Sequence, residues 1–191
     1  MGRSKPAALF LAPGASGRAD HPVFVALEEA LAPLPIERHD FEHVLAGKKG
    51  APRAERVLPE IVMAVSALAE SLAVGTDRLV IGGRSFGGRV CSMAAAEGLR
   101  VAGLVLLSYP LHPPGKPDRL RVDHFGRIDV PVLLVSGDRD PFGRPDEFAE
   151  HVAAFGGDVE SVWVEGGTHD PRYKGREAQV VEAVSDWIRE R

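Results

Sequence analysis

The sequence predicts an α/β protein: a three-layer α/β/α sandwich in which helices cover both faces of a mostly parallel, six-stranded sheet. Two observations predict this fold. Short apolar runs alternate with helix-like stretches along the whole chain, and such alternation is typical of parallel strands joined by helical crossovers. One run, Val101–Leu107, is apolar throughout, as expected of a strand that is buried on both faces.

The first half of the chain contains three predicted strands and three predicted helices. The strands are expected at Ala8–Ala12, Ile36–Phe41 and Leu79–Ile81. The helices are expected at 21–34, 51–74 and 86–97, where apolar residues recur three and four positions apart. Asp20 is the expected cap of the first helix, and Gly75 and Gly98 follow the ends of the other two.

The second half of the chain repeats this alternation. Strands are expected at Val101–Leu107, Val130–Val135 and Val159–Val164. Helices are expected at Asp146–Phe155 and Arg176–Glu190, with a short one within residues 120–128. The sequence shows no interdomain linker, and 191 residues are an ordinary length for one domain, so we expect a single domain over residues 1–191.

Composition and charge exclude several classes of function. The chain is 45% hydrophobic and 26% charged, with a formal net charge of −4, so it offers no electrostatic basis for binding nucleic acid or an anionic membrane. It has one cysteine, Cys91, which excludes an internal disulfide and favours a reducing compartment. We therefore expect a cytoplasmic location. Cys91 is expected to be a buried packing residue.

The most informative motif lies between the third predicted strand and the helix that follows it. Gly83-Arg84-Ser85-Phe86-Gly87 matches G-x-S-x-G, and a strand-to-helix turn is the context in which this motif forms a nucleophile elbow. The alternative is a phosphate-binding P-loop, which needs a lysine and a hydroxyl after its last glycine. Here Gly87 is followed by Gly88 and Arg89, so the elbow is the better interpretation.

A serine needs a base and an acid to become a nucleophile. His169 follows the last predicted strand, in agreement with the order serine, acid, histidine of elbow hydrolases. Asp138 and Asp140 both follow the fifth strand. We favour Asp140 because it lies farther beyond the strand end, whereas Asp138 could bond its own backbone.

The remaining candidate residues lie in loops at the same edge of the sheet. The backbone N–H groups of Phe86 and Ala15 are the expected oxyanion donors. Ser16, Arg84 and Tyr109 are expected to contact the substrate. Arg84 and Arg89 flank the elbow, and two roles stay open for them: attraction of an acidic substrate, or solvated structural arginines.

A zinc site is a weaker alternative. His39–His43 reads H-x-x-E-H, a metalloprotease pattern that requires a helix so that both histidines share a face. Here the pattern ends a predicted strand, and a third ligand is not evident. We therefore expect no metal and no cofactor.

The segments GGRSFGGR, LLSYPLHPPGKPDRLR and VPVLLVSGDRDPFG resemble the α/β-hydrolase superfamily. More narrowly, they resemble a small family that includes a testis-expressed α/β-hydrolase-like protein and a related subunit of a histone-acetyltransferase complex. Bacterial members of that family are similar to dienelactone hydrolases. The resemblance implies Ser85 as nucleophile, Asp140 as acid and His169 as base, and a sheet that lacks the superfamily's first hairpin.

The chain departs from these relatives in its first loop. They commonly have His-Gly where this chain has Pro13-Gly14, so the support of the oxyanion loop is expected to differ. No insertion after Val101–Leu107 is long enough for a large lid. We therefore expect a minimal, lidless fold with a shallow, open pocket that suits small esters.

These observations predict a serine hydrolase that cleaves small carboxylic esters through an acyl-enzyme. Its expected partner is a small ester substrate, with no nucleic acid and no membrane, and a homodimer is left open. Two alternatives remain. The chain could be a non-catalytic hydrolase-like binding module, or a thioesterase or peptidase that uses the same three residues.

Overall fold

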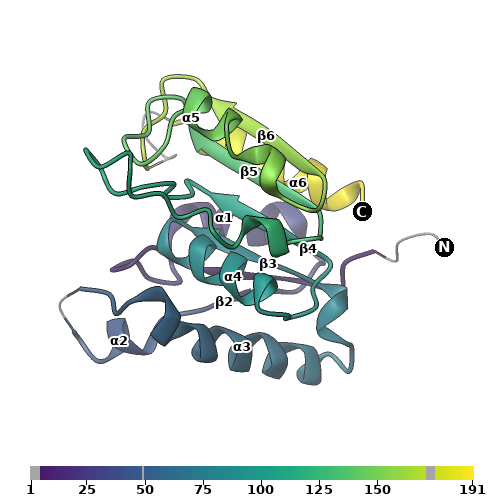
Figure 1. Cartoon of the computed structure of the whole chain (residues 1–191). Helices are drawn as coiled ribbons and strands as arrows, with labels where there is room; N and C mark the ends of the chain where they lie inside the picture. The colour runs from purple at the N-terminus through teal and green to yellow at the C-terminus, as the bar shows by residue number, and fades with distance from the viewer. Residues whose placement is uncertain (1–4, 49, 171–174) are drawn as a thin grey trace.

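The computed structural model describes residues 5–48, 50–170 and 175–191, and its central element is a twisted six-stranded sheet (Figure 1). Neighbouring strands all run parallel, in the order β2–β1–β3–β4–β5–β6. The strands are β1 Ala8–Ala12, β2 Ile36–Arg38, β3 Leu79–Arg84, β4 Gly103–Leu107, β5 Val132–Gly137 and β6 Val159–Val164. The predicted parallel sheet is confirmed.

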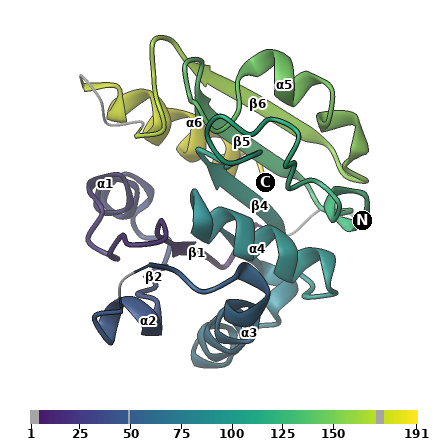
Figure 2. The same ribbon diagram turned by 60° about the vertical axis from the view of Figure 1, so that its left-hand side comes forward.

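Helices cover both faces of this sheet, which confirms the predicted three layers (Figure 2). They are α1 Pro22–Leu31, α2 Glu42–Leu45, α3 Ala54–Ser71, α4 Phe86–Ala96, α5 Pro145–Ala149 and α6 Glu177–Arg189, with short 3₁₀ helices at Thr76–Arg78, Phe125–Arg127 and Val152–Ala154. Helices α1 and α6 pack together on one face, and α3 and α4 on the other. No helix among the described residues is long and apolar enough to cross a membrane.

Each buried strand supplies side chains to two cores. In β1, Leu9 and Leu11 pack toward α1 and α6, whereas Phe10 packs toward α3 and α4. This follows from the alternation of side chains along a strand. Because both faces are covered, every residue of β1 is buried, which explains why it reads as a continuous apolar run.

Two predicted element boundaries in the N-terminal half of the chain are wrong. The strand predicted over Ile36–Phe41 ends at Arg38, because the fully buried Phe41 turns to pack on the ring of Phe86 instead of continuing along the sheet. Asp20 does not cap α1. Pro22 is the first helical residue and His21 occupies the cap position, since a proline with a fixed φ and no N–H is well suited to begin a helix.

The prediction of a single helix over Asp146–Phe155 is also wrong. It is divided into α5 and the 3₁₀ helix Val152–Ala154. The N–H groups of Gly156 and Gly157 both donate to the carbonyl of Ile128. These two bonds turn the chain only after Phe155. Within the predicted helix, the N–H groups of His151, Ala154 and Phe155 donate to carbonyls three residues back, so the α-helix does not continue beyond α5.

The order of the strands reverses at one point of the sheet. Strand β2 lies on one side of β1, and β3 to β6 follow on the other, so the order reverses between β1 and β3, where α/β sheets bind ligands. Ala12 is in register with Gly83, so the loops after β1 and β3 emerge side by side. A Cβ on Gly87 would overlap the Ala12 carbonyl oxygen, so only glycine lets α4 begin this close to β1.

Cys91 lies in α4 and is fully buried, which confirms the predicted packing role. Its Sγ donates to the Gly82 carbonyl oxygen over 3.2 Å. Burial raises the pKa of this thiol far above its ordinary value, so the thiol is unreactive at neutral pH. The cytoplasmic location that we expect from the single cysteine stays a prediction.

The buried His124 makes the stability of the fold depend on pH. The Ser92 hydroxyl donates to the Arg89 carbonyl, so we assign the 2.8 Å contact between His124 Nε2 and Ser92 Oγ to an Nε2–H donor. Burial, followed by the charges of Arg89 and Arg127, lowers the pKa of His124 from 6.5 to about 4. The unfolded chain therefore binds this proton at a higher pH than the folded protein does. We expect the free energy of unfolding to fall as the pH drops from about 6.5 toward about 4.

The test is urea unfolding of the wild type and of His124→Gln across that pH range. Glutamine keeps a donor for Ser92 but does not titrate, so the variant should lose less stability on acidification than the wild type. His151→Gln, which removes a histidine outside this contact, is the matched control and should follow the wild type. Equal pH dependence in all three proteins would refute the prediction.

Candidate active site

Ser85 sits at a sharp turn between β3 and α4. Its backbone has φ 52° and ψ −115°, a region that residues with a side chain rarely adopt and that is typical of strained functional sites. Two bonds hold this turn: Ser85 N donates to the Leu107 carbonyl (2.8 Å), and Arg89 N donates to the Ser85 carbonyl (3.0 Å). The sequence motif thus forms the strand–turn–helix context expected of a nucleophile elbow.

The structure brings Ser85, His169 and Asp140 together. His169 Nε2 lies 2.8 Å from Ser85 Oγ, and His169 Nδ1 lies 2.8 Å from Asp140 Oδ2. Asp140 is fully buried, whereas the His169 side chain is 19% exposed. Since an ionised carboxylate can only accept, we assign the imidazole proton to Nδ1. Nε2 is then free to accept the proton of the serine hydroxyl.

The geometry distinguishes the two candidate acids. Asp140 Oδ1 accepts the N–H of Phe142 over 2.8 Å while its Oδ2 faces His169. Asp138 N donates to the Val164 carbonyl, and its Oδ1 is buried without a hydrogen-bond partner in the described part of the chain. Asp140 is therefore the carboxylate beside the histidine.

Two glycines let His169 reach across the sheet from β6. A Cβ on Gly137 would overlap the carbonyl carbon of Gly167, so the loop after β6 crosses directly over the end of β5. Arg139 N holds this crossing by donating to the Gly167 carbonyl over 2.9 Å. The close approach of the two backbones directs His169 back toward β3.

Phe142, which was not predicted to belong to the site, supports the histidine. The ring of Phe142 stacks on the imidazole of His169, with centroids 4.0 Å apart and planes 26° apart. Phe142 comes two residues after Asp140, so the same short loop supplies both the carboxylate and the stacked ring. An aromatic residue this close after the acid is the signal that could have indicated it.

Two of the three expected substrate contacts have other partners in the structure. Arg84 Nη2 donates to the His169 carbonyl over 2.9 Å, so it holds the histidine loop. Tyr109 is fully buried and its hydroxyl donates to the Arg121 carbonyl over 2.7 Å. Because an engaged, buried tyrosine cannot reach a substrate, we revise its role to support of the loop after β4. Ser16 is exposed in the loop after β1.

The two expected oxyanion donors lie beside the serine. A Cβ on Gly14 would lie 3.9 Å from Ser85 Cβ, which places the Ala15 loop next to Ser85. Phe86 is the first residue of α4, where backbone N–H groups have no helical partner. In the described residues, neither the Phe86 N–H nor the Ala15 N–H meets an acceptor. Both are available to bind a negatively charged oxygen.

A family model described as an alpha/beta hydrolase domain matches residues 5–188 of this chain. The chain belongs to the α/β-hydrolase family.

Solved structures of low sequence identity share this fold. Est1E from Butyrivibrio proteoclasticus with bound ferulic acid is 21% identical, with 98% of this chain and 90% of that chain covered and a TM-score of 0.74. Dienelactone hydrolase from Anabaena variabilis ATCC 29413 is 17% identical over 98% and 87% of the two chains, with a TM-score of 0.75. Mouse alpha/beta hydrolase domain-containing protein 10 is 15% identical over 98% and 92%, with a TM-score of 0.69. The narrower resemblance to the testis-expressed family stays a prediction.

His43 supports the first loop of this α/β hydrolase. Its Nε2–H donates to the Ala15 carbonyl over 2.8 Å, and its ring contacts Phe86. His39, its partner in the zinc-like pattern, instead contacts Glu60 Oε1 over 2.9 Å. The two histidines therefore serve different contacts, and among the described residues no group of three potential metal ligands occurs. No local pattern indicates the His43 contact, because it joins residues 28 positions apart.

The segment after β4, the one predicted cover of the hydrolase site, is held to its surroundings. His112 N donates to the Phe142 carbonyl, and His112 Nε2 lies 2.9 Å from Glu147 Oε1 on α5. Leu111 is fully buried, and its carbonyl accepts from Arg121 N. The segment is therefore held near both of its ends, and residues 114–120 between them are exposed.

Proposed function

We propose that this α/β hydrolase is a serine hydrolase that cleaves small carboxylic esters through an acyl-enzyme. The observation that most supports the proposal is the pair of 2.8 Å contacts that joins Ser85, His169 and Asp140. A strained serine, a base within hydrogen-bond reach and a buried acid that orients the base are the three parts of nucleophilic acyl transfer.

Acylation begins when Ser85 Oγ attacks the ester carbonyl carbon. His169 Nε2 takes the hydroxyl proton, and Asp140 stabilises the resulting imidazolium through the Nδ1–H bond. The carbonyl π electrons move to its oxygen, which the N–H groups of Phe86 and Ala15 bind. When the tetrahedral intermediate collapses, the bond to the alcohol oxygen breaks and His169 returns the proton to that oxygen.

Deacylation repeats these steps with water. His169 Nε2 removes a proton from water, the hydroxide oxygen bonds to the acyl carbon, and the bond to Ser85 Oγ breaks. His169 then reprotonates Ser85, and the carboxylic acid leaves. The contact of His43 with the Ala15 carbonyl supports the oxyanion loop in both half-reactions, since it limits rotation of the loop backbone.

The segment after β4 is short and exposed between its two held ends, and among the described residues it supplies no large apolar cover, which favours small substrates over long lipids. The printed names of structural neighbours agree with ester chemistry: an Est1E structure contains ferulic acid, and another neighbour is a dienelactone hydrolase. Thioester and peptide cleavage would use the same three residues. Parallel rates on acyl-CoA, peptide and ester substrates distinguish these reactions.

A fluorophosphonate probe tests the proposal directly. We expect it to modify Ser85, located by mass spectrometry of the digested protein, and we expect turnover of short p-nitrophenyl esters. Labelling should be lost in Ser85→Ala. If well-folded wild-type protein takes up no probe and hydrolyses no short ester, the chain is a non-catalytic module instead.

A further inference from the structure

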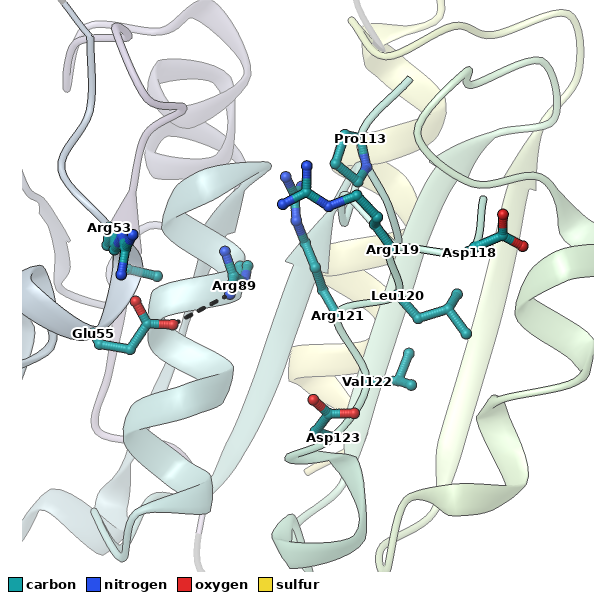
Figure 3. A pocket seen from close by; sticks show the side chains of 11 residues that line it. Arg53, Glu55, Arg89, Pro113, Asp118, Arg119, Leu120, Arg121, Val122 and Asp123 are labelled. Carbon is teal, nitrogen blue, oxygen red and sulfur yellow. Dashed lines mark ion pairs between the residues drawn. The ribbon is translucent and has the colours of Figure 1, made fainter. Parts of the chain in front are cut away.

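A groove rich in arginine lies between α3, α4 and the segment after β4. Its volume is about 740 Å³, and four arginines line it: Arg53, Arg89, Arg119 and Arg121. Figure 3 shows Arg53 and Arg89 on one wall, with the guanidinium groups of Arg119 and Arg121 extending from the other. The groove is thus positively charged on two sides.

These arginines are only partly neutralised by acids. Arg89 pairs with Glu55 at 3.6 Å, but the Glu55 side chain is 61% exposed, so the pair is weak. Asp118 and Asp123 also line the groove, yet Asp118 points away from the arginines (Figure 3). Neither Arg53 nor Arg119 forms an ion pair in the described part of the chain.

Arg121 experiences this excess charge. Burial, and then the positive charge of Arg89, lowers the pKa of its guanidinium, and Arg119 acts in the same direction. Two bonds fix the position of Arg121. Its Nη1 donates to the Pro110 carbonyl over 3.3 Å, and its carbonyl accepts the hydroxyl of the buried Tyr109. A fixed, partly buried arginine among like charges is stabilised by an added anion.

The groove and Ser85 are connected through α4, because Arg89 lines the groove and Ser85 immediately precedes this helix. Arg89 follows Ser85 by four residues and bonds its carbonyl, so the two are one helical turn, about 6 Å, apart along the axis. Helix α4 thus places one of the groove's arginines one turn from the candidate nucleophile, a separation that a short substrate chain can span.

We propose that this groove binds an oxyanion, a carboxylate or phosphate, carried by the ester substrate. The proposal rests on the proposed function for the reaction at Ser85, but the anion site itself does not require it. Guanidinium groups on two walls match the oxygen atoms of a carboxylate or phosphate, which accept paired N–H bonds. The groove thereby accounts for Arg89, for which the sequence left two roles open.

Binding is tested by calorimetric titration of inorganic phosphate and, separately, of glutarate. The test variant Arg53→Gln/Arg119→Gln removes two exposed arginines that have no packing role. Arg56→Gln/Arg100→Gln is the matched control, with the same charge change outside the groove. We expect affinity to fall by about tenfold in the test variant and to stay near wild type in the control. The tighter of the two anions identifies the group.

Equal weakening in both variants, or no binding of either anion to the wild type, overturns the proposal. A second measurement concerns turnover: the ratio of kcat/KM for the p-nitrophenyl monoester of glutaric acid to that for neutral p-nitrophenyl butyrate should fall about tenfold in the test variant only. If the wild type hydrolyses neither ester, the proposed function fails, whereas the titration still decides the anion site.

Discussion

Ser85→Ala is expected to lower kcat for p-nitrophenyl acetate by on the order of 10⁵-fold. Oγ is the atom that forms the acyl-enzyme in our proposal, and alanine supplies no substitute. The residual rate would come from binding and from the oxyanion donors alone. Steady-state kinetics with highly purified protein measure this loss, and thermal unfolding of the variant verifies that the fold persists.

Ser71→Ala is the matched control for that experiment. Ser71 is an exposed serine at the end of α3 whose hydroxyl donates only to the Leu68 carbonyl, so its loss should leave kcat near the wild-type value. Turnover by a folded Ser85→Ala at a rate close to that of Ser71→Ala would exclude Ser85 as the nucleophile. In that case, any hydrolysis would have to come from another group.

Asp140→Asn is expected to reduce kcat by roughly 10⁴-fold. The substituted side chain would present an amide to His169 Nδ1, and an amide N–H there favours the tautomer that carries its proton on Nε2. That tautomer cannot accept the proton of Ser85. The loss should appear in kcat at neutral pH, with little change in the unfolding temperature because the amide has nearly the shape of the carboxylate.

The neighbouring aspartate supplies a stringent control. Asp138→Asn makes the same chemical change two residues earlier, at a carboxylate that does not contact His169 in the described structure. We expect it to retain most of the wild-type kcat. A larger loss in Asp138→Asn than in Asp140→Asn would show that Asp138 is the functional acid.

Much of the fold was predictable because its signals are local. Buried parallel strands read as continuous apolar runs, and Ala8–Ala12 has the same bounds in prediction and structure. The failures come from tertiary contacts that override local pattern. Phe41 leaves the predicted strand to pack on Phe86. The helix predicted over Asp146–Phe155 is followed directly by Gly156 and Gly157, whose N–H groups bond to the distant Ile128 carbonyl, and its second half is a short 3₁₀ helix.

The candidate site was predictable to a similar degree. In a parallel sheet, the residues that follow the strands gather at one edge, so Ser85, an aspartate after β5 and His169 were expected there from chain order alone. Their contacts with one another have the expected order in the structure. Their catalytic roles stay a proposal until the serine and aspartate variants are measured.

Periodicity and short motifs were enough to specify the parallel α/β sheet, the strand–turn–helix setting of Ser85 and the edge at which the functional loops meet. Long-range packing was needed to bring the favoured Asp140, and not Asp138, into contact with His169 and to place Tyr109 in the core. The same packing gives Arg84 and His43 their supporting contacts and assembles the arginine groove. The reason is physical: such contacts join residues far apart in the chain, and their geometry depends on where loops cross, as at Gly137 and Gly167.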